Sequence, residues 1–98
     1  MERVKLSAEE ILANLAELNY WKVVDGKLLK RFTFPNFAES LAFVNKIGEI
    51  AETQDHHPDI NFGWGYAEIF ITTHDAGGIT NKDFELAKKI DGIESGKD

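Results

Sequence analysis

The segment from Asp59 to Thr73 constrains the fold more than any other part of the chain, because its pattern predicts two strands and the way they pair. Trp64 and Gly65, preceded by another glycine, favour a tight turn. Opposed residues of an antiparallel pair lie on the same face, so a turn here gathers the apolar residues on one side. A slip of one residue would mix the two faces, which favours this register. The opposed pairs are Ile60 with Ile69 and Phe62 with Ala67 on the apolar face, and Asn61 with Glu68 on the other.

A second hairpin is expected nearer the N-terminus, between Trp21 and Phe34. Asp25 and Gly26 separate two arms rich in strand-forming residues, and a type I′ turn needs positive φ at both of its central positions. Pro35 then ends the second arm, because proline has no N–H to donate to a sheet. The residues that share one face of the second arm are Leu28, Phe32 and Phe34.

Three helices are expected around the hairpins, at about 7–19, 36–54 and 80–92. Ser7 and Glu10 form a capping box at the start of the first helix. Asn36, supported by Glu39, caps the second helix, and Thr80 caps the third. The apolar residues expected to face the core are Ile11, Leu12, Leu15 and Leu18 in the first helix, Phe37, Leu41, Phe43, Val44, Ile47, Ile50 and Ala51 in the second, and Phe84, Ala87 and Ile90 in the third.

The order of these elements is helix, two strands, helix, two strands, helix. Paired strands separated by helices predict an α+β two-layer sandwich, in which a four-stranded antiparallel sheet carries the helices on one face. With 98 residues and no repeat or linker, we expect a single domain over 1–98. Such a chain buries only somewhat over ~60% of its unfolded surface. Tyr66, Glu68 and Phe70 would also leave aromatic groups on the outer face of the sheet, so self-association is expected.

Composition excludes several classes of function. The net charge is −6 and the basic residues are scattered, whereas a phosphate-binding surface needs clustered lysine and arginine, so no direct contact with nucleic acid is expected. The absence of cysteine removes disulfides and thiolate chemistry. The N-terminus lacks the apolar region of a signal peptide, and no stretch approaches the ~20 apolar residues of a membrane span. We therefore expect a cytoplasmic protein that does not interact with a membrane.

The three histidines lie just outside the 59–73 hairpin, His56 and His57 before its first strand and His74 after its second. Continued beyond the strands, the register sets residue 55 opposite 74 and residue 57 opposite 72, so the imidazoles should converge. Imidazole exchanges protons near neutral pH, because its unperturbed pKa is ~6.5. The carboxylates expected nearby are Glu52, Asp55 and Asp75. The pattern predicts an acid–base site at the open end of the hairpin.

Each of these residues also has a structural interpretation. A single histidine is usually a surface or capping residue, and only the clustering favours a site. Asp83 lies at N3 of the third helix, where a carboxylate is stabilising in any case, so capping is its simpler interpretation. Trp64 either covers the core or flanks a flat ligand. Adjacent histidines such as His56 and His57 rarely bind one ion and cysteine is absent, so no metal is expected.

The run Glu52-Thr-Gln-Asp-His56-His57-Pro58-Asp-Ile-Asn-Phe-Gly-Trp64, followed by His74 and then Asp83, resembles the signature of the pterin-4a-carbinolamine dehydratase family. That signature has an acidic or polar residue, three spacers, His-His-Pro, an aromatic residue, a second histidine region and an aspartate on a helix. The stretch from Thr73 to Thr80 also looks like the family's Thr-His loop. The similarity covers most of the chain. One departure is Ile60, where animal members carry tryptophan, and it would give the pocket a different wall.

The resemblance implies a dehydratase that converts 4a-hydroxytetrahydrobiopterin to quinonoid dihydropterin and water, in the recycling pathway that serves aromatic amino-acid hydroxylases. It implies histidine acid–base catalysis without a metal or organic cofactor. His56, His57 and His74 would be the acid–base and binding histidines, with Glu52 and Asp83 orienting them. Of the three, His57 and His74 are expected to transfer protons. The implied pterin-binding residues are Asp55, His56, His57, Pro58, Trp64, Thr73, His74, Asp75 and Ala76, with Asp55 at the amino-pyrimidine edge.

The resemblance also implies assembly into a homodimer or homotetramer, and it leaves two alternative functions. Animal members act as dimerisation cofactors for a transcription factor, so a non-enzymatic binding role is one alternative. An enzyme acting on another pterin, for instance in molybdopterin metabolism, is the other. The complete histidine set favours an enzyme, because an interface alone has no need of three clustered imidazoles.

Overall fold

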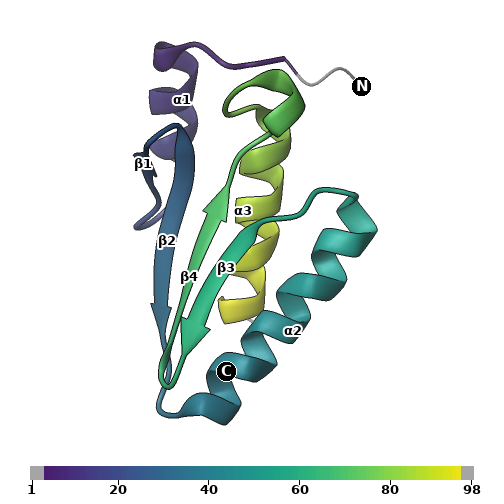
Figure 1. Ribbon diagram of the computed structural model, residues 1–98. Coiled ribbons are helices and arrows are strands. Elements are labelled where there is room, and N and C mark those ends of the chain that lie inside the picture. Colours follow the sequence, from purple (N-terminus) through teal and green to yellow (C-terminus); the bar gives the residue numbers. More distant parts are fainter. Residues whose placement is uncertain (1–3, 96–98) are drawn as a thin grey trace.

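A computed structural model describes residues 4–95 of the chain. This part forms a four-stranded antiparallel sheet with three α-helices on one of its faces, so the predicted α+β class is confirmed (Figure 1). The elements in chain order are α1 (Ala8–Leu15), β1 (Lys22–Val24), β2 (Lys27–Thr33), α2 (Phe37–Gln54), β3 (Asp59–Gly63), β4 (Tyr66–Ile71), the short 3-10 helix η1 (His74–Ala76) and α3 (Asn81–Ser95). No helix in this range is both long and apolar enough to cross a membrane.

Both predicted hairpins are present. In the hairpin of β3 and β4, Ile60 lies opposite Ile69 and Asn61 opposite Glu68, which confirms the register. At the turn between β1 and β2, φ is 53° at Asp25 and 74° at Gly26. Positive φ at both positions is what a type I′ turn requires.

The two hairpins are joined through β2 and β4, which gives the strand order β1-β2-β4-β3. Leu28 lies opposite Ile71 and Phe32 opposite Ala67 in this central pair. Beyond the last paired residues, the Thr72 hydroxyl donates to the Gly26 carbonyl at 3.2 Å. The central pairing therefore fixes where β4 ends, and the segment bearing His74 starts from that point.

The helix starts follow the predicted caps. The Ser7 hydroxyl accepts from the Glu10 N–H at 3.1 Å, and the Glu10 carboxylate accepts from the Ser7 N–H at 2.8 Å. Asn36 caps α2 by accepting from the Glu39 N–H at 2.9 Å. At the third helix, the Thr80 hydroxyl accepts from a backbone N–H two residues later, at 3.2 Å.

Two predicted helix ends are wrong. The first helix ends at Leu15 rather than near Asn19, because the chain tightens there: the Leu18 N–H bonds to the Leu15 carbonyl, and Tyr20 has a φ of 69°. The third helix continues past Gly92 to Ser95. Ile93 packs against the core in that last turn, and this contact outweighs the low helix propensity of the preceding glycine.

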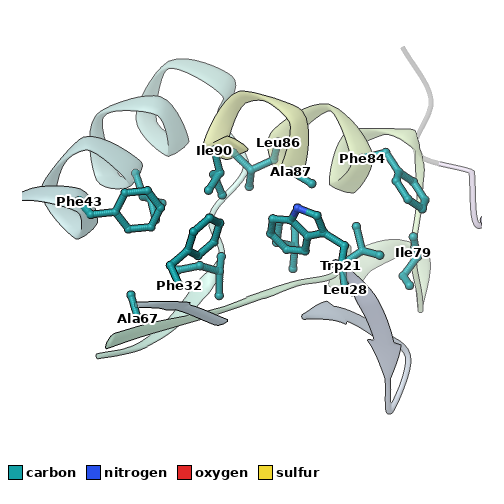
Figure 2. Close-up of a cluster of buried hydrophobic side chains, with 13 residues drawn as sticks. Trp21, Leu28, Phe32, Phe43, Ala67, Ile79, Phe84, Leu86, Ala87 and Ile90 are labelled. Carbon is teal, nitrogen blue, oxygen red and sulfur yellow. The ribbon is translucent and has the colours of Figure 1, made fainter. Parts of the chain in front are cut away.

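Side chains from the sheet, α2 and α3 form one buried cluster between the layers (Figure 2). In α3 the predicted Phe84, Ala87 and Ile90 are buried, and so is Leu86, which the pattern missed. The residues labelled in Figure 2 are Trp21, Leu28, Phe32, Phe43, Ala67, Ile79, Phe84, Leu86, Ala87 and Ile90.

Three residues expected in the core are exposed: Leu12 in α1, and Phe37 and Leu41 in α2. The buried line of α2 contains Ser40 instead, with Phe43, Ile47 and Ala51 following it. The Ser40 hydroxyl donates to the Gly63 carbonyl of β3 at 2.7 Å, so a polar residue is satisfied on this line. With this line facing the sheet, Phe37 and Leu41 lie at the edge of the interface, where the Phe37 ring stacks on Phe62 of β3 with 5.8 Å between ring centres.

Candidate functional site

The end of α2 directs the two adjacent histidines into different surroundings. Asp55 caps the helix in the left-handed conformation, with φ 53° and ψ 43°, and the His56 N–H bonds back to the Ala51 carbonyl at 3.1 Å. Pro58 keeps the residue before it out of helical conformation, so the predicted end of this helix is confirmed. Beyond the cap, the His56 side chain is buried, whereas the His57 side chain is 55% exposed.

His56 is held by Asp83, which reaches it from the first turn of α3. His56 Nε2 lies 2.5 Å from Asp83 Oδ1, and the Asp83 side chain is fully buried. Asp83 Oδ2 accepts from the Thr80 N–H at 2.8 Å and from the Thr73 hydroxyl at 3.0 Å. Asp83 therefore caps α3, as its N3 position suggested, and also orients a histidine from a distant part of the chain. A sequence position alone cannot separate these two roles.

His57 has its own carboxylate partner at the surface. His57 Nε2 lies 2.6 Å from Oε2 of Glu52, which belongs to the last turn of α2. Both side chains are largely exposed. The two adjacent histidines thus form matching pairs with carboxylates, one buried and one facing solvent. Each carboxylate holds the ring through Nε2, which leaves Nδ1 as the second polar atom of each imidazole.

The opposite wall comes from the segment after β4. Thr73 forms an antiparallel bridge with Gly78, and η1 carries His74 and Asp75 within the loop that the bridge closes. His74 is exposed, and its ring has no hydrogen-bond partner among residues 4–95.

These segments enclose a pocket of about 310 Å³. All three histidines line it, as the continued register predicted. The lining residues are Asp55, His56, His57, Thr72, His74 and Asp75. Binding sites for small ligands begin at roughly this size, about 300 Å³. A set of histidine, carboxylate and hydroxyl groups suits a polar, hydrogen-bonding ligand that gains or loses protons.

Several residues named from the sequence lie outside this lining. Trp64 lies at the closed end of the hairpin and is 70% exposed, whereas the pocket lies at the open end. Thr73 is buried behind the pocket and bonds to Asp83. Pro58 and Ala76 are half-buried neighbours of lining residues. The structure therefore brings the histidines and their carboxylates together, and leaves Trp64 apart from them.

Sequence reasoning missed one lining residue, Thr72. The signal for it was available, because the continued register already set residue 72 opposite residue 57. Among the residues described, no group of three or more histidine, aspartate or glutamate side chains is arranged to hold a metal ion.

The sequence model of the family described as pterin 4 alpha carbinolamine dehydratase matches residues 4–93. The chain belongs to this family. A relative from Picosynechococcus sp. is 48% identical over 87 residues, which cover 89% of this chain and 95% of the relative. A relative from Sulfolobus acidocaldarius is 46% identical over 91 residues, which cover 93% and 100%. Both carry the name "Putative pterin-4-alpha-carbinolamine dehydratase".

Solved structures show the same fold in the pterin carbinolamine dehydratase family. A transcriptional coactivator/pterin dehydratase from Brucella melitensis is 28% identical, with a TM-score of 0.86 over 91% of this chain and 97% of its own. A pterin dehydratase-like protein, identified as a RuBisCO assembly factor in the alpha-carboxysome, is 27% identical, with a TM-score of 0.61 over 74% and 84%. Proteins of similar fold thus carry the names of a dehydratase, a transcriptional coactivator and an assembly factor.

Proposed function

We propose that this protein dehydrates 4a-hydroxytetrahydropterin, of which 4a-hydroxytetrahydrobiopterin is one form, to quinonoid dihydropterin and water. The observation that carries the proposal is a polar pocket lined by three histidines, two of them paired with carboxylates. Family membership supports the substrate class. The complete set of acid–base groups supports turnover rather than binding alone.

The reaction is an elimination that needs two proton movements and no redox partner. The bond from C4a to its hydroxyl oxygen breaks, and a proton delivered to that oxygen lets it leave as water. The proton on N5 is removed, and its electron pair forms the C4a–N5 double bond. Each positioned proton-transfer group typically contributes ~10²–10⁴-fold to such a rate.

The two exposed histidines are the proposed proton-transfer groups. His57 approaches the pocket from the end of α2 and is oriented by Glu52, while His74 approaches from η1 on the opposite wall. A flat ligand between them would have one imidazole on either side. Asp55 and Asp75, which also line the pocket, would accept hydrogen bonds from the amino-pyrimidine edge.

The test follows the loss of the 4a-hydroxy absorbance in a coupled tetrahydropterin hydroxylase assay, after subtraction of the uncatalysed rate. We expect His57→Ala and His74→Ala each to lower turnover at least ~10-fold, because each removes a proton-transfer group. Both side chains are exposed, so the circular dichroism spectrum should not change. Asn45→Ala, an exposed change in the middle of α2, is the control and should keep full activity. Full activity in both histidine variants would refute the acid–base assignment.

A binding role is the second candidate, and two observations favour it. Solved structures of similar fold are named as a transcriptional coactivator/pterin dehydratase and as a RuBisCO assembly factor. This chain also exposes apolar side chains at Phe37, Leu41 and Trp64, which would suit contact with a second copy or another protein. If the purified protein gives no rate above the uncatalysed reaction, the binding role becomes the better interpretation. Size-exclusion chromatography tests the expected dimer or tetramer.

A further inference from the structure

Behind the pocket, buried hydroxyl groups form a chain of hydrogen bonds whose direction can be assigned. The Lys82 N–H donates to Thr80 Oγ1 at 3.2 Å, the two hydroxyls of Thr80 and Thr73 lie 2.9 Å apart, and the Thr73 hydroxyl donates to Asp83 Oδ2 at 3.0 Å. A threonine hydroxyl has one proton to donate. Since Thr73 gives its proton to Asp83, the Thr80 hydroxyl must be the donor to Thr73.

This direction leaves one oxygen of Asp83 for His56. Oδ2 already accepts from two donors, the Thr80 N–H at 2.8 Å and the Thr73 hydroxyl. Oδ1 faces His56 Nε2 at 2.5 Å. A carboxylate only accepts hydrogen bonds, so the proton in this contact belongs to Nε2. No residue in this series of hydrogen bonds (Thr73, Thr80 and Asp83) is more than 1% exposed, so bulk water does not compete for the bonds.

The other ring nitrogen of His56 is directed elsewhere. In the described part of the chain, every buried side-chain nitrogen and oxygen has a hydrogen-bond partner. No partner is found for His56 Nδ1 among residues 4–95, so this atom is in contact with solvent. The open surface beside His56 is the pocket that it lines.

We propose that Thr73 and Thr80 are positioning residues which, through Asp83, hold His56 with a proton on Nε2 and with Nδ1 toward the pocket, so that Nδ1 is the acceptor in the neutral ring. The part that concerns catalysis rests on the proposed function: Nδ1 of the neutral ring then accepts a hydrogen bond from the pterin and orients it between His57 and His74. Thr80 is thus more than the cap of α3, and Thr73 contributes to the site from behind it. The bridge between Thr73 and Gly78 holds the two hydroxyls together.

The first measurement needs no substrate. Nitrogen-15 spectra of the imidazole rings, recorded over a pH range that reaches the neutral ring, identify which nitrogen of each histidine carries the proton. We expect His56 in the wild-type protein to be protonated on Nε2. Protonation on Nδ1 instead would overturn the proposal, and this result requires no variant to fold.

The second measurement removes one hydroxyl at a time. Thr73→Val and Thr80→Val leave the Asp83 carboxylate as an acceptor but hold it less firmly, so each should shift the His56 Nε2 resonance while the proton stays on Nε2. Under the proposed function they should lower kcat about 10-fold with KM within ~2-fold of wild type, since the pocket lining is intact. Thr73→Ser, which restores the hydroxyl, should recover the wild-type spectrum and rate. Thr33→Val, an exposed threonine of β2, is the matched control and should change neither.

The two proposals can fail separately. If the protein has no dehydratase activity, but His56 is protonated on Nε2 and its spectrum changes in Thr73→Val, the positioning role of the two threonines is supported and the proposed function is refuted. If the enzyme is active and the spectrum of His56 is unchanged in both valine variants, the positioning role of the two threonines is refuted and the proposed dehydratase function is supported.

Discussion

The half-buried ion pair between Lys30 and Asp91 offers a test of what ties the sheet to α3. Lys30 Nζ lies 2.8 Å from Asp91 Oδ1, and the two side chains are only 12% and 25% exposed. The Trp21 indole N–H donates to the same carboxylate, at 3.1 Å to Oδ1 and 3.0 Å to Oδ2. Lys30 Nζ also lies 4.6 Å from the centre of the Phe32 ring. Asp91 is therefore the shared acceptor of two donors that point inward.

Removing the charge of Asp91 should cost more than removing that of Lys30. Asp91→Asn keeps an oxygen for the indole but leaves a mostly buried ammonium without its carboxylate. Breaking a fully buried pair in this way costs ~3–5 kcal/mol. Residual exposure and the flexible lysine reduce this, so we expect a loss of about 2 kcal/mol in the free energy of unfolding. Lys30→Met leaves a quarter-exposed carboxylate that still accepts from Trp21, so its cost should stay below about 1 kcal/mol.

The double variant separates the interaction from the individual changes. Lys30→Met with Asp91→Asn removes both charges, keeps the indole acceptor and should be within ~1 kcal/mol of wild type, because well-packed neutral replacements of buried pairs are often tolerated. The coupling energy would then be at least ~1 kcal/mol. For a domain of this size, a loss of 2 kcal/mol corresponds to a fall in Tm of ~8–16 °C.

The assay is urea unfolding at one fixed protomer concentration, because self-association would make the apparent stability depend on concentration. Lys88→Met is the matched control: Lys88 pairs with Glu17 at 3.5 Å with both side chains more than half exposed, and such pairs contribute ~0–1 kcal/mol. The reasoning is refuted if Asp91→Asn loses no more than the Lys88 control, or if the double variant is less stable than Asp91→Asn.

Two further predictions concern glycines and carboxylates of the fold. Gly48→Ala should raise the free energy of unfolding by ~0.5–1 kcal/mol, because a Cβ there meets nothing within 4 Å and alanine favours a helix. Gly26→Ala should lower the free energy of unfolding by ~1–2 kcal/mol, because φ at this position is +74°. Thermal unfolding of both variants checks the opposite signs. Glu52→Gln should lower dehydratase turnover while the free energy of unfolding stays within ~0.5 kcal/mol of wild type, since that side chain is 79% exposed. Asp83→Asn should lower both turnover and the free energy of unfolding, because the Asp83 side chain is fully buried. Equal losses of stability in the two variants would contradict the burial argument.

Local patterns predicted much of the fold. Capping boxes and Asp-Gly turns act between residues a few positions apart, so Ser7, Asn36 and Asp25 could be interpreted from their neighbours alone. The register of the hairpin of β3 and β4 was also local, because the turn and the alternation of one segment determine it. From this register came the convergence of the three histidines at one pocket.

Predictions failed where the outcome depended on distant partners. Lys30 lies between Leu28 and Phe32 on the inward face of β2, and no pattern in that strand indicates that Asp91 on α3 would accept its charge. Phe37 and Leu41 fit an apolar helical face, but the buried line of α2 instead includes Ser40, whose hydroxyl bonds to the Gly63 carbonyl of β3. Periodicity describes a helix face without its partner, so it cannot decide between two adjacent apolar lines.

Trp64 shows the same limit at the site. Its position in the family signature associates it with the pocket, yet the strand between it and His57 carries it to the closed end of the hairpin. An extended strand advances about 3.3 Å per residue, so residues a few positions apart in sequence end far apart in space.

The amino-acid sequence by itself determined the hairpins, the helix starts, the α+β class and the arrival of three imidazoles at the open end of one hairpin, because short-range hydrogen bonding and alternation encode all of these. Only the tertiary structure decided that Asp83 would meet His56, that two threonine hydroxyls would stand behind that contact, and which line of α2 would be buried. The contact of His56 with Asp83 joins the end of α2 to the start of α3, 27 positions apart, and its geometry exists only after the sheet and helices have packed together.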